Sequence, residues 1–239
     1  MNNFDIDLIN KYVEEKERDN ALSLLKKGYP VQYIIGNVDF YNLNIKVNEN
    51  VLIPRFETEY LVDDLIKLIN KYNFINPNII DIGTGSGCIA LAMKQNVKSN
   101  VTGIDISKKA LDVAKKNANI NNIDVNFIEM DMNNIDIVTK FDVLVSNPPY
   151  VPYNSDVDLK IKYEPQNAIY APDDGLYFYK VILSQCQKLL NKKNIIAFEI
   201  GDKQSESIIK IIKEYYPNSS IISKEDLNHY DRYIYVINE

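Results

Sequence analysis

The stretch Asp81-Ile82-Gly83-Thr84-Gly85-Ser86-Gly87 decides the fold of this chain. The apolar run that ends at Ile82 is typical of a buried strand, and residues 87–96 follow with helical spacing. Glycines at alternate positions permit a tight turn and let a ligand approach the backbone closely. The helix that begins behind them offers free N–H groups. This strand, loop and helix predict a ligand site at the carboxyl end of a strand in an open α/β sheet.

The same alternation of strand and helix continues from Asn78 to the C-terminus. Strands are predicted over residues 79–82, 101–105, 125–129, 141–146, 195–200, 220–223 and 233–237, and helices over 87–96, 107–119, 174–190 and 203–215. Such alternation indicates an α/β fold with a mostly parallel sheet and helices on both faces. The last two runs lie too close together for a crossover helix, so we expect a seven-stranded sheet whose last strand is antiparallel.

The N-terminal part of the chain has a different pattern. Residues 4–27 alternate apolar and charged side chains at helical spacing, until Gly28 and Pro30 stop the helix. Two β-prone runs on either side of Asn42 predict a hairpin, and a further helix is expected over residues 57–72. We therefore predict three parts: a reduced N-terminal helical segment at 1–30, a β-hairpin linker at 31–54 and a larger α/β domain at 55–239.

The composition indicates an ordinary acidic globular protein. Of 239 residues, 46% are hydrophobic and 25% are charged, and the net charge is -6. That balance gives no electrostatic footprint for nucleic acid, and the first 50 residues carry six Lys or Arg against eight Asp or Glu. Cys88 and Cys186 lie in apolar helical contexts without zinc-ligand spacing, so we predict reduced core thiols in a cytoplasmic protein.

Two further classes are disfavoured. No apolar run has the length of a membrane span. The start of the chain, Met1 to Asp7, is polar and acidic, unlike a signal peptide.

The glycine spacing narrows the kind of ligand. It reads G-x-G-x-G, whereas a dinucleotide fingerprint needs G-x-G-x-x-G, and the Gly-Lys-Ser/Thr of a nucleotide P-loop is missing from it. Asp105 ends the next predicted strand, where a carboxylate can accept both hydroxyls of a ribose. Together the loop and this acid resemble the cofactor site of class I S-adenosylmethionine-dependent methyltransferases.

A second motif, Asn147-Pro148-Pro149-Tyr150, follows the predicted strand at 141–146. A carboxamide nitrogen is a poor nucleophile because its lone pair is delocalised into the carbonyl group. The side-chain oxygen of Asn147 and the carbonyl of Pro148, held in place by the proline ring, can accept hydrogen bonds from both N–H groups of such a nitrogen. This aims the lone pair at a methyl donor, and orientation of this kind can supply several kcal/mol of the barrier.

The ring of Tyr150 can form a wall against the planar substrate group. We therefore predict Asn147, Pro148 and Tyr150 as catalytic residues, and Asn147, Pro148, Pro149 and Tyr150 as substrate-binding. Methyl transfer needs no strong general base beforehand, and the sequence offers no obvious one nearby. The motif would serve any conjugated NH2 group, including adenine N6, so it specifies a type of reaction and not a substrate.

Further collinear blocks run from about residue 30 to the C-terminus: Pro30–Gly36, Phe40-Tyr41, Leu52–Glu59, Asp81–Leu91, Ser146–Tyr150, Tyr163-Glu164-Pro165, Asp174–Tyr179, Glu199–Gly201 and Asp231-Arg232. With these blocks the chain resembles the bacterial HemK/PrmC family of release-factor glutamine N5-methyltransferases. The Asn-Pro-Pro-Tyr motif is shared with other amino-methylating enzymes. Pro-Arg-x-Glu-Thr-Glu, at residues 54–59, and Tyr-Glu-Pro, at 163–165, are more specific to this family.

The resemblance implies a class I methyltransferase fold and a substrate, the glutamine side chain in the Gly-Gly-Gln motif of peptide chain release factors. Nucleic acid, membrane and metal are not implied. The S-adenosylmethionine contacts would come from Gly83, Thr84, Gly85, Ser86, Gly87, Asp105, Met132 and Asn147. Met132 takes a position often held by an aromatic residue, so we expect weaker and more plastic stacking on adenine.

The chain also departs from the family pattern. About 28 residues precede the hairpin region, where the family usually has several helices, so the resemblance implies a shortened N-terminal domain and leaves the docking of a release factor open. Phe56 replaces a usual proline, Ala171-Pro172 a usual Gly-Gly, and His229-Tyr230 interrupts a usual Gly-Arg. We expect shifted or stiffer loops there, with His229 on the surface.

Two alternatives remain at this point. A nucleic-acid amino-methyltransferase of the adenine N6 type would need a recognition domain or a basic groove, and would bind DNA or RNA with a steep salt dependence. A non-catalytic binding subunit on the same fold would lack the intact glycine loop, Asp105 and Asn-Pro-Pro-Tyr motif, and would fail to bind S-adenosylmethionine.

Overall fold

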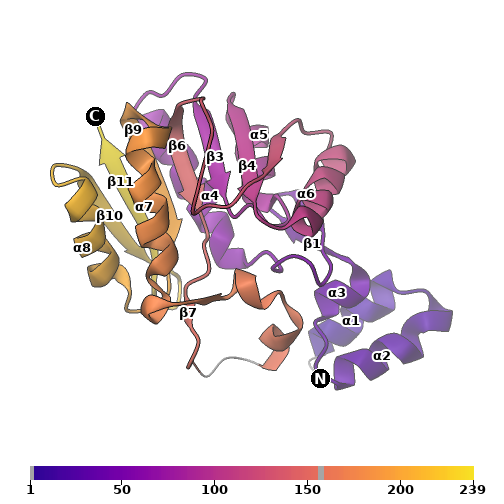
Figure 1. Cartoon of the computed structure of the whole chain (residues 1–239). Helices are drawn as coiled ribbons and strands as arrows, with labels where there is room; N and C mark the ends of the chain where they lie inside the picture. The colour runs from indigo at the N-terminus through magenta and orange to yellow at the C-terminus, as the bar shows by residue number, and fades with distance from the viewer. Residues whose placement is uncertain (1–2, 156–158) are drawn as a thin grey trace.

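A computed structural model describes residues 3–155 and 159–239. It has a central sheet between two layers of helices, with the N-terminal helices set to one side (Figure 1). The strands of the central sheet are β3 (Asn78–Ile82), β4 (Asn100–Asp105), β5 (Asn126–Glu129), β6 (Phe141–Ser146), β9 (Leu190–Glu199), β10 (Ser220–Glu225) and β11 (Asp231–Asn238). Their order is β10-β11-β9-β6-β3-β4-β5. Only β11 runs against its neighbours, which confirms the seven-stranded, mostly parallel sheet that the sequence predicts.

Alternate residues of each central strand enter two separate cores. In β6, Val143 and Val145 belong to one core, while Leu144 belongs to the other. The first core is completed by α4 (Phe56–Lys71), α5 (Cys88–Asn96) and α6 (Lys108–Asn121), and the second by α7 (Tyr177–Leu189) and α8 (Ser205–Tyr215). Strands buried on both faces need continuous apolar runs, which is the pattern the sequence has here.

The predicted elements agree with the structure to within a few residues. The main exception is β9, which begins at Leu190, immediately after α7, because that residue pairs with Phe141 at the start of β6. Cys88 and Cys186 are buried and free, as expected. In the ranges 3–155 and 159–239, no helix is long and apolar enough to cross a membrane.

The N-terminal part differs more. Helices α1 (Asn3–Tyr12) and α2 (Arg18–Lys26) are followed by α3 (Val31–Ile35), a helix where the sequence places the start of the hairpin linker. This short helix starts after Pro30 and ends at Gly36, whose left-handed conformation is usual for a helix end. Its β-branched run gives no helical period, so packing against the neighbouring helices decides its conformation.

The predicted hairpin is present. Strands β1 (Asn37–Phe40) and β2 (Leu43–Lys46) pair antiparallel. The two turn residues between them, Tyr41 and Asn42, have φ values of 48° and 62°. Two consecutive positive φ values are the mark of the type I′ turn, which matches the twist of the flanking strands.

The chain order brings the two sequence motifs together. From β3 the sheet grows outward through β4 and β5, and the chain then returns to lay β6 on the other side of β3. The hydroxyl of Ser146 donates a 2.6 Å hydrogen bond to the Ile82 carbonyl, so the ends of β6 and β3 are level. This is a topological switch point, where open α/β sheets bind ligands.

We expect Asn117→Ala to destabilise the protein by about 1 to 3 kcal/mol. The Asn117 side chain is fully buried; its oxygen accepts from Lys46 N at 2.7 Å, and its nitrogen donates to the carbonyls of Lys46 and Ser86. It therefore ties the hairpin to the glycine loop. The free energy of unfolding, measured with urea, tests this. The exposed Asn119→Ala is the control, and equal stability of the two variants would contradict the assignment.

Candidate active site

A cavity of about 450 Å³ opens at the switch point. Its size lies within the range of small-molecule sites. Six of the predicted site residues line it, namely Gly83, Gly85, Asp105, Met132, Asn147 and Pro149. They come from the last residue of β4 and from the loops that follow β3, β5 and β6, so residues far apart in sequence meet at one edge of the sheet.

Asp105 lies at the end of β4 with both carboxylate oxygens already engaged. One oxygen accepts a hydrogen bond from Ser107 N at 2.8 Å, and the other from Gly85 N at 2.9 Å. Burial raises the pKa of this carboxyl, and the two backbone bonds oppose that rise. A carboxylate has about four acceptor positions, so two remain for the hydroxyls of a ligand in the cavity.

Three residues of the predicted cofactor set do not line the cavity. Thr84 and Ser86 are buried, and the Thr84 hydroxyl donates to Asp81 Oδ2 at 2.6 Å. Gly87 lies at the start of α5 with φ of 81°, and a Cβ there would approach Phe127 to 3.0 Å. These residues shape the loop from behind. The motif spacing alone does not show which loop residues face the ligand, because the backbone conformation of the turn determines the direction in which each residue points.

Asp81 is a fully buried acid under the glycine loop. Its Oδ2 accepts from Thr84 and from Ala90 N, while its Oδ1 has no hydrogen-bond partner among the described residues. Burial raises its pKa to about 7. An unpaired buried carboxylate oxygen is costly, which agrees with a carboxyl that keeps its proton to higher pH; Asp81 itself does not line the cavity.

Two segments outside the predicted site residues also line the cavity, and both overlap blocks on which the family resemblance rests. One covers residues 49–52 and the other includes Pro165, Asn167 and Ala168. Glu164, only 4% exposed, joins them: it accepts from Ile53 N at 2.9 Å and forms an ion pair with Arg55 at 2.5 Å. Arg55 lies in the family block Pro-Arg-x-Glu-Thr-Glu, and Glu164 lies in the block Tyr-Glu-Pro. Their opposite charges are the signal in the sequence that points to a contact between these two segments.

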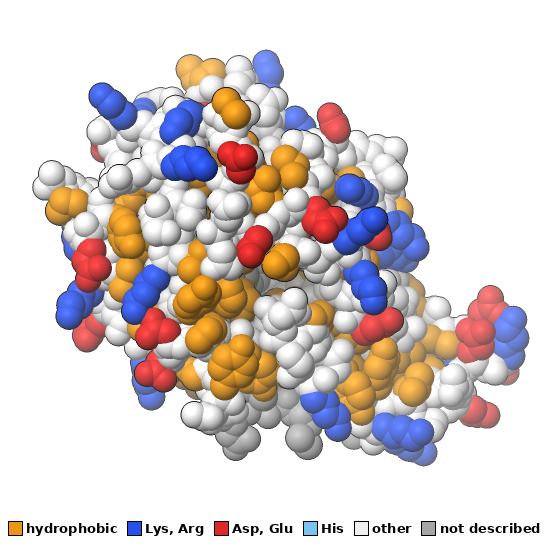
Figure 2. All heavy atoms as spheres, in the orientation of Figure 1, with side chains coloured by type: hydrophobic (Ala, Val, Ile, Leu, Met, Phe, Trp, Pro, Cys, Tyr) orange, Lys and Arg blue, Asp and Glu red, His pale blue; other side chains and the backbone are white. Residues whose placement is uncertain are grey.

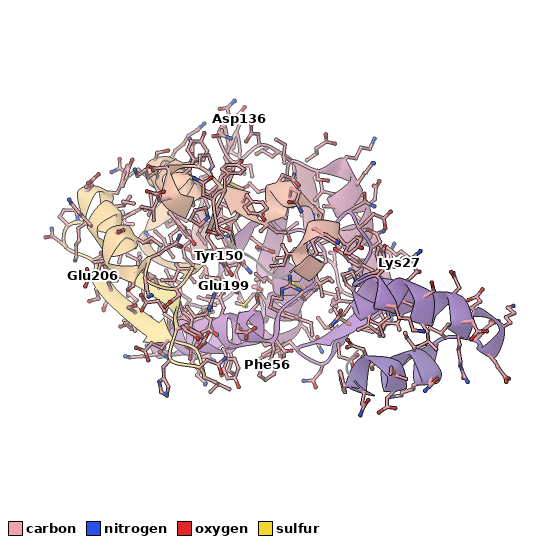
Figure 3. The ribbon with its side chains drawn as sticks, turned by 90° about the horizontal axis from the view of Figure 1, so that it is seen from below. Lys27, Phe56, Asp136, Tyr150, Glu199 and Glu206 are labelled. Carbon is pink, nitrogen blue, oxygen red and sulfur yellow. The ribbon has the colours of Figure 1, made fainter. Side chains whose placement is uncertain are left out.

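The Asn-Pro-Pro-Tyr segment presents only part of itself to the cavity. Asn147 is part-buried and Pro149 lines the cavity, whereas Pro148 and Tyr150 are not among its lining residues. The Tyr150 hydroxyl instead points to Glu199 Oε1 at 3.3 Å, and the two residues lie side by side in Figure 3. The hydroxyl end of the ring is thus directed into the protein, and a wall formed by the ring against a substrate stays a prediction.

The backbone of the segment is held firmly at its end. The Tyr150 carbonyl accepts from Gln204 Nε2 at 3.0 Å. Gly175, with φ of 86°, passes so close that a Cβ would come within 2.1 Å of the same carbonyl oxygen. A side chain at Gly175 would therefore displace the segment.

Residues that depart from the family pattern lie outside the cavity. The Phe56 side chain is 61% exposed and packs edge-on against Tyr60. His229 is exposed in the turn between β10 and β11, beside Glu225. Its surface position agrees with the sequence-based expectation. Among the described residues there is no group of His, Cys, Asp or Glu suited to a metal ion.

The surface charge is mixed. On the face shown in Figure 2, basic and acidic side chains alternate around the molecule without a continuous basic band. With a net charge of -6, this distribution gives little support to a phosphate backbone as ligand on that face.

The chain resembles known methyltransferases in sequence and fold. Residues 75–233 match a family model described as a methyltransferase domain. The chain is 40% identical over 216 residues to the release factor glutamine methyltransferase of Fusobacterium nucleatum, covering 86% of this chain but only 60% of that protein. It is 39% identical over 202 residues to the enzyme of the same name from Streptococcus pneumoniae, covering 82% of this chain and 71% of that protein.

A solved structure supports the same relationship. The protein-(glutamine-N5) methyltransferase, release factor-specific, from Alicyclobacillus acidocaldarius superposes with a TM-score of 0.50 at 25% identity. The superposition covers 82% of this chain and 99% of that one.

We expect Glu164→Gln to weaken the binding of S-adenosylmethionine by about 1 to 2 kcal/mol, roughly five- to thirty-fold in Kd. The substitution removes the charge that holds two cavity walls together. Calorimetric titration measures the effect. Asp173→Asn, which disrupts an exposed ion pair with Lys180, is the control and should leave Kd unchanged. An unchanged Kd for Glu164→Gln would show that the walls hold without this pair.

The buried acid Asp81 gives a pH dependence of stability. Its pKa is raised to about 7 in the folded protein, against about 3.9 in an unfolded chain. Between these values the folded protein holds a proton that the unfolded chain has released, so the free energy of unfolding falls as pH rises through this window. In urea titrations without cofactor, the free energy of unfolding of Asp81→Asn should no longer fall as pH rises through this window. The exposed Asp112→Asn is the control and should show the same fall as the wild type. Parallel pH profiles for Asp81→Asn and the wild type would contradict the assignment.

Proposed function

Because the chain belongs to the release factor glutamine methyltransferase family, we propose that it methylates the side-chain nitrogen N5 of a glutamine. The methyl donor is S-adenosylmethionine, and the glutamine is that of the Gly-Gly-Gln motif in peptide chain release factors. The observation that carries the proposal is the meeting of the glycine loop, Asp105 and Asn147 around one cavity. A cofactor site and an amide-orienting residue thus share a single space.

The cavity residues suit this cofactor. The backbone of Gly83 and Gly85 allows close approach, Asp105 retains acceptor positions for the ribose, and Met132 offers an apolar surface to the adenine. A Cβ on Gly83 would lie 3.7 Å from Met132 Cε, so a side chain there would narrow the cavity. When bound, S-adenosylmethionine supplies an electrophilic methyl group.

The protein's own part is to orient the substrate nitrogen. In the described part of the chain, no group donates a hydrogen bond to Asn147 Oδ1 or to the Pro148 carbonyl. Both oxygens are therefore available to accept the two N–H groups of a glutamine side chain. Such acceptance favours a pyramidal nitrogen whose lone pair faces the methyl group. With the cofactor bound, the nitrogen would take the methyl group from the sulfonium sulfur, leaving S-adenosylhomocysteine, and would release one N–H proton to water.

We also propose different roles for the three parts of the chain. Residues 55–239 carry the chemistry, with residues 49–52 of the linker completing the cavity wall. The helices of segment 1–30 and the hairpin of the linker 31–54 contribute to holding the release factor. Lys27, labelled in Figure 3, lies at the junction: its carbonyl accepts from the Tyr163 hydroxyl at 3.0 Å. That bond joins the helices to the loop that contains Glu164. A cytoplasmic location follows from the substrate class and stays a prediction.

Incubation of a purified release factor with the enzyme and S-adenosylmethionine should add the mass of one methyl group to the Gly-Gly-Gln peptide. Asn147→Ala should bind the cofactor with at most slightly reduced affinity and lose about a hundred-fold or more in turnover, as for other orienting groups. Peptide mass spectrometry and calorimetry measure the two effects.

The control substrate is a release factor whose Gly-Gly-Gln glutamine is replaced by alanine, which should gain no mass. Near wild-type methylation by Asn147→Ala would disprove the role of Asn147. Methylation of an adenine-containing nucleic acid in place of the release factor would favour the nucleic-acid alternative.

A further inference from the structure

A chain of hydrogen bonds runs from the Asn-Pro-Pro-Tyr segment into the protein interior. Asn147 Nδ2 faces Thr58 Oγ1 at 3.4 Å, and Thr58 Oγ1 faces Glu199 Oε2 at 2.6 Å. Thr58 is 2% exposed and Glu199 is 1% exposed. Thr58 belongs to the first turn of α4 and Glu199 ends β9, so three distant parts of the chain meet behind the cavity.

Burial raises the pKa of Glu199, whereas the hydrogen bond from Thr58 and the charge of Arg232 lower it. With Glu199 ionised, the three groups allow only one direction for this chain. The carboxylate accepts hydrogen bonds and donates none, so the single hydroxyl proton of Thr58 goes to Glu199. The hydroxyl oxygen then has only lone pairs left for Asn147. The group of Asn147 that faces Thr58 must therefore be the NH2, and its oxygen Oδ1 is turned the other way.

Glu199 also holds the other end of the segment. Its second oxygen, Oε1, accepts from the Tyr150 hydroxyl at 3.3 Å, and Arg232 donates to the same hydroxyl at 3.4 Å. The Glu199 backbone carbonyl accepts from Tyr179 at 2.8 Å. One carboxylate thus joins Asn147, through Thr58, to Tyr150.

Stability alone gives little reason for a carboxylate here. Among the described residues Glu199 forms no ion pair within 4.0 Å, and Arg232, which contacts the same Tyr150 hydroxyl, pairs with Asp226 instead. A buried charge without a direct partner costs free energy, and apolar residues of similar volume often serve a core equally well. Its contacts with both ends of the substrate-binding segment indicate a role in positioning.

We propose that Thr58 and Glu199 are positioning residues that set the orientation of the Asn147 carboxamide, so that Oδ1 and not the NH2 group meets the substrate nitrogen. The inference rests on the proposed function for the identity of that substrate. Without the relay the carboxamide is free to rotate by half a turn. The NH2 of Asn147 would then face the NH2 of the glutamine, and two hydrogen-bond donors cannot bond to each other.

The test uses the full-length enzyme with substitutions at Thr58. Thr58→Val keeps the shape but has no hydroxyl, and we expect kcat for release-factor methylation to fall by about ten- to a hundred-fold. The Kd of S-adenosylmethionine should stay within about twofold, because neither Thr58 nor Glu199 lines the cavity. Thr58→Ser restores the hydroxyl and should recover most of kcat. The exposed Thr139→Val is the matched control and should behave as the wild type.

Glu199→Gln tests the terminal acceptor. Its new NH2 group can donate to Thr58, whose own proton can then turn toward Asn147 and reverse the relay. We expect a loss of kcat similar to that of Thr58→Val, and little further loss in the double variant, because both remove the same constraint. Should Thr58→Val fail to fold, Glu199→Gln and Thr58→Ser still test the proposal.

Turnover within threefold of wild type for Thr58→Val or Glu199→Gln would overturn the proposal, as would an equal loss of cofactor affinity and kcat. A readout independent of the substrate separates this proposal from the function. In nitrogen-15 spectra of the apoprotein, the Asn147 side-chain NH2 should have shifted resonances and slow proton exchange with water, and Thr58→Val should abolish both features. An unshifted, rapidly exchanging NH2 in the wild type would overturn the relay, even if the wild type methylates a release factor. If the wild type fails to methylate it, the function fails while the spectra still decide the relay.

Discussion

The parallel pairing of β3 with β6 is the contact on which the site depends. Asp81 pairs with Val145, and Ser146 bonds the Ile82 carbonyl, so the glycine loop and the Asn-Pro-Pro-Tyr segment leave the sheet side by side. These motifs lie some sixty residues apart in sequence, and a shift of this register would move the whole segment relative to the loop. A methyl donor and an amide acceptor can share one cavity only because this pairing is fixed.

Two buried carboxylates connect the segments that surround the cavity. Glu164 joins the two segments that wall the cavity, and Glu199 joins Asn147 to Tyr150 from behind. Each carboxylate is almost fully buried. Glu164 accepts hydrogen bonds from Ile53 and Arg55, in the segment before α4, and Glu199 accepts from Thr58 in α4 and from Tyr150 after β6. Ion pairs and relays of this kind place side chains more accurately than exposed loops do, because both partners are held by packing. The orientation of the cavity residues therefore depends on residues that do not line the cavity, Glu164 and Glu199 among them.

Local pattern was enough to predict the central domain. The strands and helices after Asn78 have clear periods, and the rule that ligands bind at the carboxyl ends of parallel strands placed Gly83, Asp105 and Asn147 together. Helix α3 was missed because five residues are too few to show a helical period. The side-chain partners could not be predicted: Thr58 and Glu199 lie 141 residues apart and Arg55 and Glu164 lie 109 apart, and no local pattern pairs residues at such distances. The inward direction of Tyr150 follows from those same partners.

A structure of the enzyme with S-adenosylhomocysteine and a Gly-Gly-Gln peptide would test the central claim most directly. The account predicts the glutamine nitrogen within about 2.7 to 3.2 Å of both Asn147 Oδ1 and the Pro148 carbonyl, with Thr58 between the Asn147 NH2 and Glu199. A glutamine amide bound outside this cavity, or one whose oxygen rather than nitrogen faces Asn147 Oδ1 and the Pro148 carbonyl, would contradict it.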